Sequence, residues 1–451
     1  MFYLMMLFFM NNKYLNLIIS NLIMVMLLFN LFNFSWIEWI IYMWNFSFNN
    51  YSYGLMMLTL WIFSLIFLSL NNNSINCLLI NLLLMMSLLF VFMSMNFLLF
   101  YLFYELGLLI IFYMVVKWGY SENRWLAGFY LMFYTMVFSL PMLYIIYYIY
   151  WMNNSLNFML MEMLNFNLNF MLFMYLLMSF LVKIPIYMFH GWLLKAHVEA
   201  PYYGSMILAS IMLKLGGYGM LRMMMMMKFE FIYFSKILIV VNLFGVLILS
   251  LMCLMQYDMK SIIAISSIVH MGLMIMSMLT FFKLSLIGSY MMMVSHGLSS
   301  SGLFFLVNVI YKQTNSRLMF VNKGMINFMP SMSLMWFMLC SSNMGSPVSL
   351  NLVSEVMLMI GLIFWLKYLF IILMMYCLFS FIYSVYLFMI INHGKNYINF
   401  KINNSMMIDY YILLMHWIPL NLMFLKLYFI YLNSLIKMLI CEINDMNFYL
   451  F

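Results

Sequence analysis

Residues 97–116 read FLLFYLFYELGLLIIFYMVV, and Glu105 is the only charged residue among them. A helix of about 20 mainly apolar residues is long enough to cross the hydrocarbon core of a bilayer. Similar apolar runs recur along the chain, separated by short polar connections. We predict membrane-spanning helices near 1–10 (short), 15–34, 53–70, 76–94, 96–116, 125–151, 168–190, 204–227, 234–255, 261–281, 285–311, 328–365, 366–391 and 410–432.

The composition excludes a soluble domain. Of 451 residues, 68% are apolar and 7% are charged, against about 25% charged in an ordinary soluble domain. The apolar runs are continuous rather than alternating, which indicates helices and not the strands of a membrane barrel. The predicted fold class is therefore an all-α integral membrane protein with about fourteen transmembrane helices, surrounded by lipid.

Charge and cysteine usage narrow the function further. The formal net charge of +8 is spread thinly, without a polybasic block, so we predict no nucleic-acid binding. The five cysteines, at 77, 253, 340, 377 and 441, form no CxxC motif and no Cys/His pair. No GxGxxG fingerprint is present either. We therefore expect neither a metal site nor a redox cofactor on this chain.

Two of the apolar runs contain helix-breaking residues. One has Lys-Ile-Pro at 183–185, and the other has SSNMGSPVSLNL at 341–352. A proline inside a helix removes a backbone hydrogen bond and clashes with the preceding turn. Such breaks persist at membrane depth only where protein or a water-filled cavity surrounds them, and paired breaks in two halves of a chain are typical of transporters. We predict broken helices at both places.

The few charges inside the apolar runs indicate the chemistry. Four charged residues each stand alone in an apolar run: Glu105, Lys183, Lys214 and Glu355. Two histidines, His270 and His296, are likewise the single ionisable residues of their runs. One charge at a helix centre costs about 2.5–3.5 kcal/mol, so these residues should be paired, hydrated or functional. The structural alternatives are lysines that reach the interface, histidines that join two helices, and glutamates that act as simple partners.

Lysine, glutamate and histidine can all exchange protons, and burial brings their proton affinities closer together. We predict that Glu105 faces Lys183 inside the bundle. We also predict that one buried polar axis joins five groups: Lys183, Lys214, His270, His296 and Glu355. The spacing alone leaves open which of these side chains touch, because they lie on different helices.

Several stretches around these charges resemble a known family. They are FYELGLLIIFYMVVKWGYSENRWLAGFYLMFYT (103–135), LVKIPIYMFHGWLLKAHVEAPYYGSMILA (181–209), LKLGGYGMLR (213–222), QYDMKSIIAISSIVHMGLM (256–274), SHGLSSSGLFF (295–305) and PVSLNLVSEVMLM (347–359). In this order they resemble the antiporter-like subunits of respiratory complex I, NADH:ubiquinone oxidoreductase. KAHVEAP followed by LKLGGYG is the most specific of these matches.

The resemblance implies two inverted five-helix repeats. The implied division is an N-terminal group of helices at 1–94, a first antiporter-like repeat at 95–230, a second at 231–391, and a C-terminal helix and tail at 392–451. It also implies that the six buried groups named above relay protons. Three further residues match family positions and would be auxiliary polar groups: His190, His197 and Glu199.

The resemblance implies partners as well. NADH, FMN, iron–sulfur clusters and ubiquinone would be bound by other subunits, and two sister antiporter-like subunits would flank this chain in the membrane arm. The implied location is the mitochondrial inner membrane. High usage of Met (61), Phe (46) and Tyr (34) is typical of AT-rich animal mitochondrial genes, in which AUA encodes methionine.

Two other functions remain possible on the residues alone. A subunit of a multi-subunit cation/proton antiporter would carry the same buried charges, and only chain length, codon bias and the KAHVEAP–LKLGGYG motifs disfavour it. A non-transporting membrane scaffold would tolerate replacement of the buried charges, because nothing would depend on their proton exchange.

Overall fold

The computed structural model describes residues 20, 40–43, 46–70, 75–164, 168–395 and 406–425. The predicted spans at 1–10 and 15–34 fall outside these residues, apart from residue 20. Within the described part, ten helical stretches are long and apolar enough to cross a membrane. They are α3 (Asn50–Ser69), α4 (Ile75–Met93), α5 (Phe97–Trp118), α6 (Arg124–Asn153), the stretch Tyr202–Met226, α12 (Lys228–Leu254), α13 (Met259–Met278), α14 (Lys283–Thr314), α18 (Leu369–Asn392) and α19 (Met407–Leu425).

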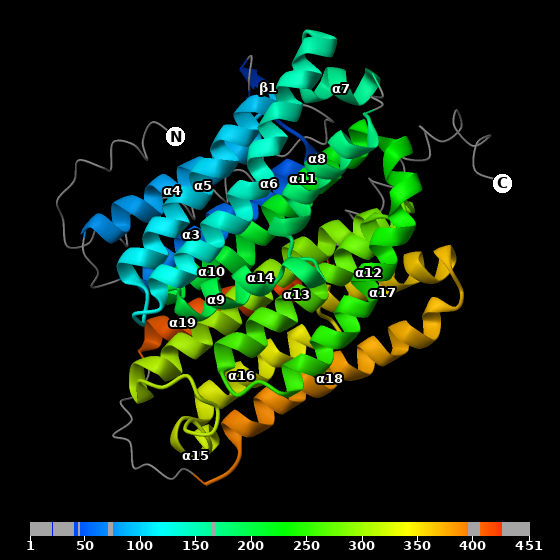
Figure 1. Ribbon diagram of the computed structural model, residues 1–451. Helices are drawn as coiled ribbons and strands as arrows, with labels where there is room; N and C mark the ends of the chain where they lie inside the picture. Colours follow the sequence, from blue (N-terminus) through cyan, green and yellow to red (C-terminus); the bar gives the residue numbers. More distant parts are fainter. Residues whose placement is uncertain are drawn as a thin grey trace.

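The helices pack side by side as a bundle, with α10 and α14 near its middle (Figure 1). Three stretches each contain a segment of membrane-spanning length that the rest of the chain encloses: Tyr202–Met226, α13 and α14. These are also the stretches richest in serine, glycine and ionisable residues, whereas the half-exposed α6 and α18 present aromatic and aliphatic side chains outward. The polar groups are thus kept away from lipid, as the cost of a lipid-facing charge requires.

The remaining two predicted spans are interrupted helices. In the first, α8 (Phe170–Lys183) ends before Pro185, a short turn covers Tyr187–Phe189, and α9 (Gly191–Glu199) follows. In the second, α16 (Pro330–Asn343) and α17 (Leu350–Trp365) are separated by residues 344–349. Gly345 and Val348 in this break both have a φ of +74°. Since a β-branched residue rarely adopts such a φ, Val348 marks local strain.

The stretch Tyr202–Met226 also contains an irregularity that the sequence did not predict. It consists of α10 (Tyr202–Ile207), a π-helical turn at Leu208–Met212 and α11 (Leu213–Met226). A π turn inserts one extra residue into the helix and frees a backbone carbonyl from its usual partner. This turn comes directly before Lys214.

The chain is not helical throughout. A two-stranded antiparallel hairpin joins β1 (Ile40–Met43) to β2 (Phe46–Phe48), with Ile40 opposite Phe48. Two short helices lie in connections that we predicted as polar loops: α7 (Phe158–Leu164) and α15 (Met325–Phe328). The all-α prediction holds for the membrane-spanning part and is wrong for this small hairpin.

Candidate functional site

A buried ion pair joins α5 to the first broken helix. Lys183, the last residue of α8, places its Nζ 3.4 Å from Oε1 of Glu105. The side chains are 3% and 13% exposed, so neither charge is solvated by bulk water. The ammonium also lies over the ring of Tyr104, whose hydroxyl is 3.4 Å from the Ser179 carbonyl on α8. The predicted contact between Glu105 and Lys183 is therefore present.

An apolar contact separates this pair from the next ionisable group. At Gly216 on α11, a Cβ atom would stand 2.5 Å from Cγ1 of Ile184. It would also stand 3.3 Å from the carbonyl of Phe180. The missing side chain therefore lets α11 pack directly against the end of α8. No contact joins Lys183 to Lys214 in the described residues.

Lys214 is held by the π turn and by a histidine from the second half of the chain. Its Nζ donates to the Ala209 carbonyl at 2.6 Å and lies 2.9 Å from Nδ1 of His296 on α14. Both side chains are buried, at 0% and 1% exposure. A backbone carbonyl of the π turn at Leu208–Met212 thus anchors the lysine without a carboxylate.

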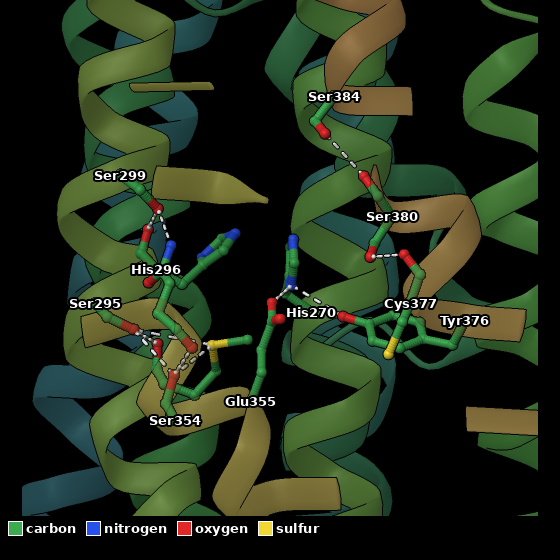
Figure 2. A network of polar contacts seen from close by, with 12 residues as sticks. His270, Ser295, His296, Ser299, Ser354, Glu355, Tyr376, Cys377, Ser380 and Ser384 are labelled. Atoms are coloured by element: carbon green, nitrogen blue, oxygen red, sulfur yellow. Dashed lines mark hydrogen bonds and ion pairs between the residues drawn. The ribbon is translucent and has the colours of Figure 1, made fainter. Parts of the chain in front are cut away.

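His270 on α13 is the centre of the second half of the site (Figure 2). Its ring centroid is 5.6 Å from that of His296. Nδ1 lies 3.2 Å from Oε1 of Glu355 on α17 and 3.2 Å from the Tyr376 hydroxyl. Nε2 lies 3.0 Å from the Tyr383 hydroxyl. Two tyrosines of α18 therefore orient the ring between the carboxylate and the second histidine.

Serines and an asparagine line the packing of α14 against the second break. Ser295 and Ser354 place their hydroxyls 3.5 Å apart (Figure 2). Asn351 donates to the Ser342 carbonyl at 2.8 Å and lies 3.4 Å from the Ser299 hydroxyl. The Ser342 carbonyl, at the end of α16, also accepts a hydrogen bond from the Gly345 amide at 3.3 Å. The break is stabilised by side chains beside Glu355 rather than by lipid-facing backbone.

The three predicted auxiliary residues, His190, His197 and Glu199, have different surroundings. His190 is half-buried, and its Nδ1 contacts the Tyr187 carbonyl within its own turn. His197 is fully buried and stacks on Phe304 at 4.9 Å, and neither of its ring nitrogens has a hydrogen-bond partner among the described residues. Sequence reasoning grouped these histidines, but the structure places His190 in a half-buried turn and His197 in the interior of the bundle.

Glu199 ends α9 and fastens it to the connection between α5 and α6. Its Oε2 accepts hydrogen bonds from the Ser121 hydroxyl at 2.6 Å and from the Ser121 amide at 3.2 Å. The backbone amide of Tyr120 donates to the Glu199 carbonyl at 3.1 Å. This carboxylate therefore has a clear positioning role at one end of the bundle.

Two buried cations escaped prediction. Lys260, the second residue of α13, is 1% exposed and donates to the Ala200 carbonyl at 2.8 Å. It precedes the span predicted at 261–281 and was not among the charges predicted inside apolar runs. Arg222, at the other end of α11, pairs with Glu162 at 3.2 Å and donates to the Tyr218 hydroxyl at 2.9 Å. Lys260 lies one residue before its predicted span, and Arg222 lies inside the span predicted at 204–227.

The geometry suits proton movement. Lys214, His296, His270 and Glu355 follow one another across three contacts, and each can hold or release a proton. The Glu105–Lys183 pair stands beside this series on the far side of Ile184. Among the described residues, no group of three His, Cys, Asp or Glu side chains is placed to hold a metal ion. The predicted single axis is thus two groups of contacts rather than one.

Comparison with known families places the chain among membrane transport subunits. The family described as NADH:quinone oxidoreductase/Mrp antiporter, transmembrane, matches residues 94–382, more than half of the chain. A chain of respiratory complex I from Thermus thermophilus with bound NADH has the same fold, with a TM-score of 0.85 at 18% identity over 93% of this chain and 92% of that one. A chain of the Mrp complex from Dietzia gives a TM-score of 0.76 at 15% identity over 85% and 76%.

Sequence similarity separates complex I chains from Mrp antiporter chains as relatives of this protein. NADH-ubiquinone oxidoreductase chain 4 of Apis mellifera ligustica is 81% identical over 345 residues, which cover 76% of this chain and 77% of that one. Chain 4 of Locusta migratoria is 44% identical over 336 residues, covering 74% and 76%. The fold alone is common to complex I and Mrp antiporters, whereas this level of identity is to chain 4. The protein therefore belongs to the NADH-ubiquinone oxidoreductase chain 4 family, the antiporter-like subunits of the membrane arm of respiratory complex I.

Proposed function

We propose that this chain translocates protons across the mitochondrial inner membrane as part of the membrane arm of complex I. The observation that carries the proposal is the buried series Lys214–His296–His270–Glu355, formed inside an apolar bundle. Four ionisable groups at this depth would be costly if they served packing alone. Their value lies in exchanging protons with one another.

The proposed mechanism couples two charge pairs through the central lysine. When Lys183 is held by Glu105, its positive charge is compensated; when that pair separates, the charge acts on Lys214 through the low-dielectric contact at Ile184. A proton released by Lys214 passes to the lone pair of His296 and then through His270 to Glu355. Water completes the steps that are longer than a hydrogen bond.

The finer architecture belongs to the same proposal. The chain would have about fourteen spans, with inverted repeats at 95–230 and 231–391. Support comes from the matching positions of the two pairs. In the first repeat, the ion at the helix break pairs with Glu105 on α5; in the second, Glu355 beside the break pairs with His270 on α13. Each repeat thus contributes one pair made by a broken helix and its neighbour.

We further propose that redox chemistry is left to other subunits. NADH, FMN, iron–sulfur clusters and ubiquinone would be bound elsewhere in the complex, and two sister antiporter-like subunits would flank this chain. The exposed aromatic face of α6, which includes Trp125, Phe133 and Tyr144, is a surface available for such neighbours or for lipid.

The test is replacement of Lys214 in the assembled complex. Lys214→Met retains length and loses the proton-carrying group, so proton uptake per NADH oxidised should fall in reconstituted vesicles. Lys214→Arg should also impair uptake, because guanidinium stays protonated. Lys236→Met is the matched control, since Lys236 is an exposed lysine on the apolar helix α12.

Normal proton uptake in Lys214→Met, with assembly intact, would overturn the proposal and favour a scaffold. A cation/proton antiporter makes a different prediction: ion exchange would continue without NADH oxidation. Measuring proton uptake with and without NADH therefore distinguishes these functions.

A further inference from the structure

Lys260 is a buried charge that the proposed relay does not use. It is 1% exposed, and among the described residues its ammonium makes one hydrogen bond, to the Ala200 carbonyl at 2.8 Å. The ammonium also lies 4.3 Å from the ring centroid of Tyr120. A lysine ammonium has three donors, and burying such a charge without a carboxylate is costly. A single hydrogen bond to the Ala200 carbonyl does not require a lysine at this position.

Lys260 lies near the end of the bundle at which α13 begins. The start of α13 meets the connection after α14 there, since the Met259 amide donates to the Arg317 carbonyl at 3.1 Å. Arg317 and Glu199, which precedes Ala200 in the chain, are both half-buried. Exposure therefore decreases from this rim to the ammonium.

His197 occupies the interior beyond Lys260. Its ring is fully buried, stacked on Phe304 with an interplanar angle of 4°, and both nitrogens lack hydrogen-bond partners among the described residues. Helix α9, which carries His197, packs against α13, which carries Lys260, and the ring stacks on a residue of α14, the helix that carries His296. A buried imidazole with two free nitrogens is the exception in proteins, where nearly all buried polar groups are paired. Stacking fixes the ring plane and leaves both nitrogens available.

We propose that Lys260 and His197 form a proton branch linking the end of the bundle at α13 to Lys214. A neutral imidazole accepts a proton at one nitrogen and releases the proton of the other, so charge is restored after each passage. Lys260 holds the proton at the rim, His197 passes it inward, and Lys214 receives it, with water bridging the gaps. This branch rests on the proposed function, because it supplies or drains the same central lysine.

The competing role for Lys260 is a structural tie between α13 and the end of α9. Lys260→Arg separates the two roles. Arginine can still donate to the Ala200 carbonyl and lie over Tyr120, but it cannot release its proton. Lys312→Arg is the matched control, because Lys312 also lies near a tyrosine ring, at 5.7 Å from that of Tyr202, yet is exposed.

The experiment measures proton uptake per NADH oxidised by the complete complex in vesicles. Lys260→Arg and His197→Gln should each lower this ratio by as much as Lys214→Met does. The double variant Lys260→Arg/Lys214→Met should lose no more than Lys214→Met alone, because both residues lie on one path. The control Lys312→Arg should keep the ratio of the unmodified complex.

Three results are decisive. If Lys214→Met lowers the ratio while Lys260→Arg and His197→Gln leave it unchanged, the branch is overturned and the proposed function stands. If Lys214→Met leaves the ratio unchanged, the proposed function itself is overturned. If Lys260→Arg prevents assembly, His197→Gln decides, since it leaves the tie at Ala200 intact.

Discussion

Removing one partner of the Glu105–Lys183 pair should damage both stability and pumping. Glu105→Gln keeps the side-chain shape and removes the negative charge, which leaves a lysine that is 3% exposed without its carboxylate. At 3.4 Å and an effective dielectric constant of about 20, Coulomb attraction is about 5 kcal/mol before desolvation is counted. Breaking a buried pair from one side costs about 3–5 kcal/mol in measured proteins, which agrees with this value.

A double replacement separates charge from structure. Glu105→Gln with Lys183→Met removes both charges, so no charge is left buried without its partner. We therefore expect Glu105→Gln alone to lower the thermal midpoint and the amount of assembled complex, and the double variant to recover most of both. Neither variant should pump normally. In Glu105→Gln the charge of Lys183 has lost its carboxylate, and in the double variant that charge is absent, so Lys183 no longer acts on Lys214 as in the unmodified protein.

The assay is thermal unfolding of the purified complex, with proton uptake measured on the same preparations. Glu122→Gln is the control: Glu122 is an exposed acid in the connection after α5, where substitutions change stability by about 0.5 kcal/mol or less. If Glu105→Gln keeps both the thermal midpoint and the proton uptake of the unmodified complex, the reasoning is refuted. A double variant as unstable as Glu105→Gln would show that packing, and not the pair, sets the cost.

Two further replacements probe the second half of the site. Tyr383→Phe removes the hydroxyl 3.0 Å from Nε2 of His270, a loss of about 1 kcal/mol, and should slow the initial rate of proton uptake up to about fivefold; Tyr368→Phe, 89% exposed, should have no effect. Gly345→Ala places a side chain at a φ of +74° and 3.1 Å from the α17 carboxylate. It should cost about 1–2 kcal/mol and lower the thermal midpoint, whereas Gly191→Ala, with no atom within 4 Å, should not.

The membrane-spanning architecture could be predicted because hydropathy is a local property. Each apolar run is read within its own 20 residues, and the described helices follow those runs closely. Both helix breaks were also predictable, since proline and glycine act on their own turns. The buried ionisable residues were identified for the same reason: a single charge in an apolar run is visible without knowledge of its neighbours.

Contacts between helices were beyond the reach of the sequence. Packing at Gly216 and Ile184 divides the predicted axis into two groups, and nothing in either local sequence states that these residues meet. Lys260 was not predicted as a buried charge, because its burial comes from Ala200 and Tyr120, which are distant in the chain. Hydropathy thus determined which residues enter the membrane. Only the tertiary structure decided which ionisable groups lie within proton-transfer distance, because that depends on how neighbouring helices pack.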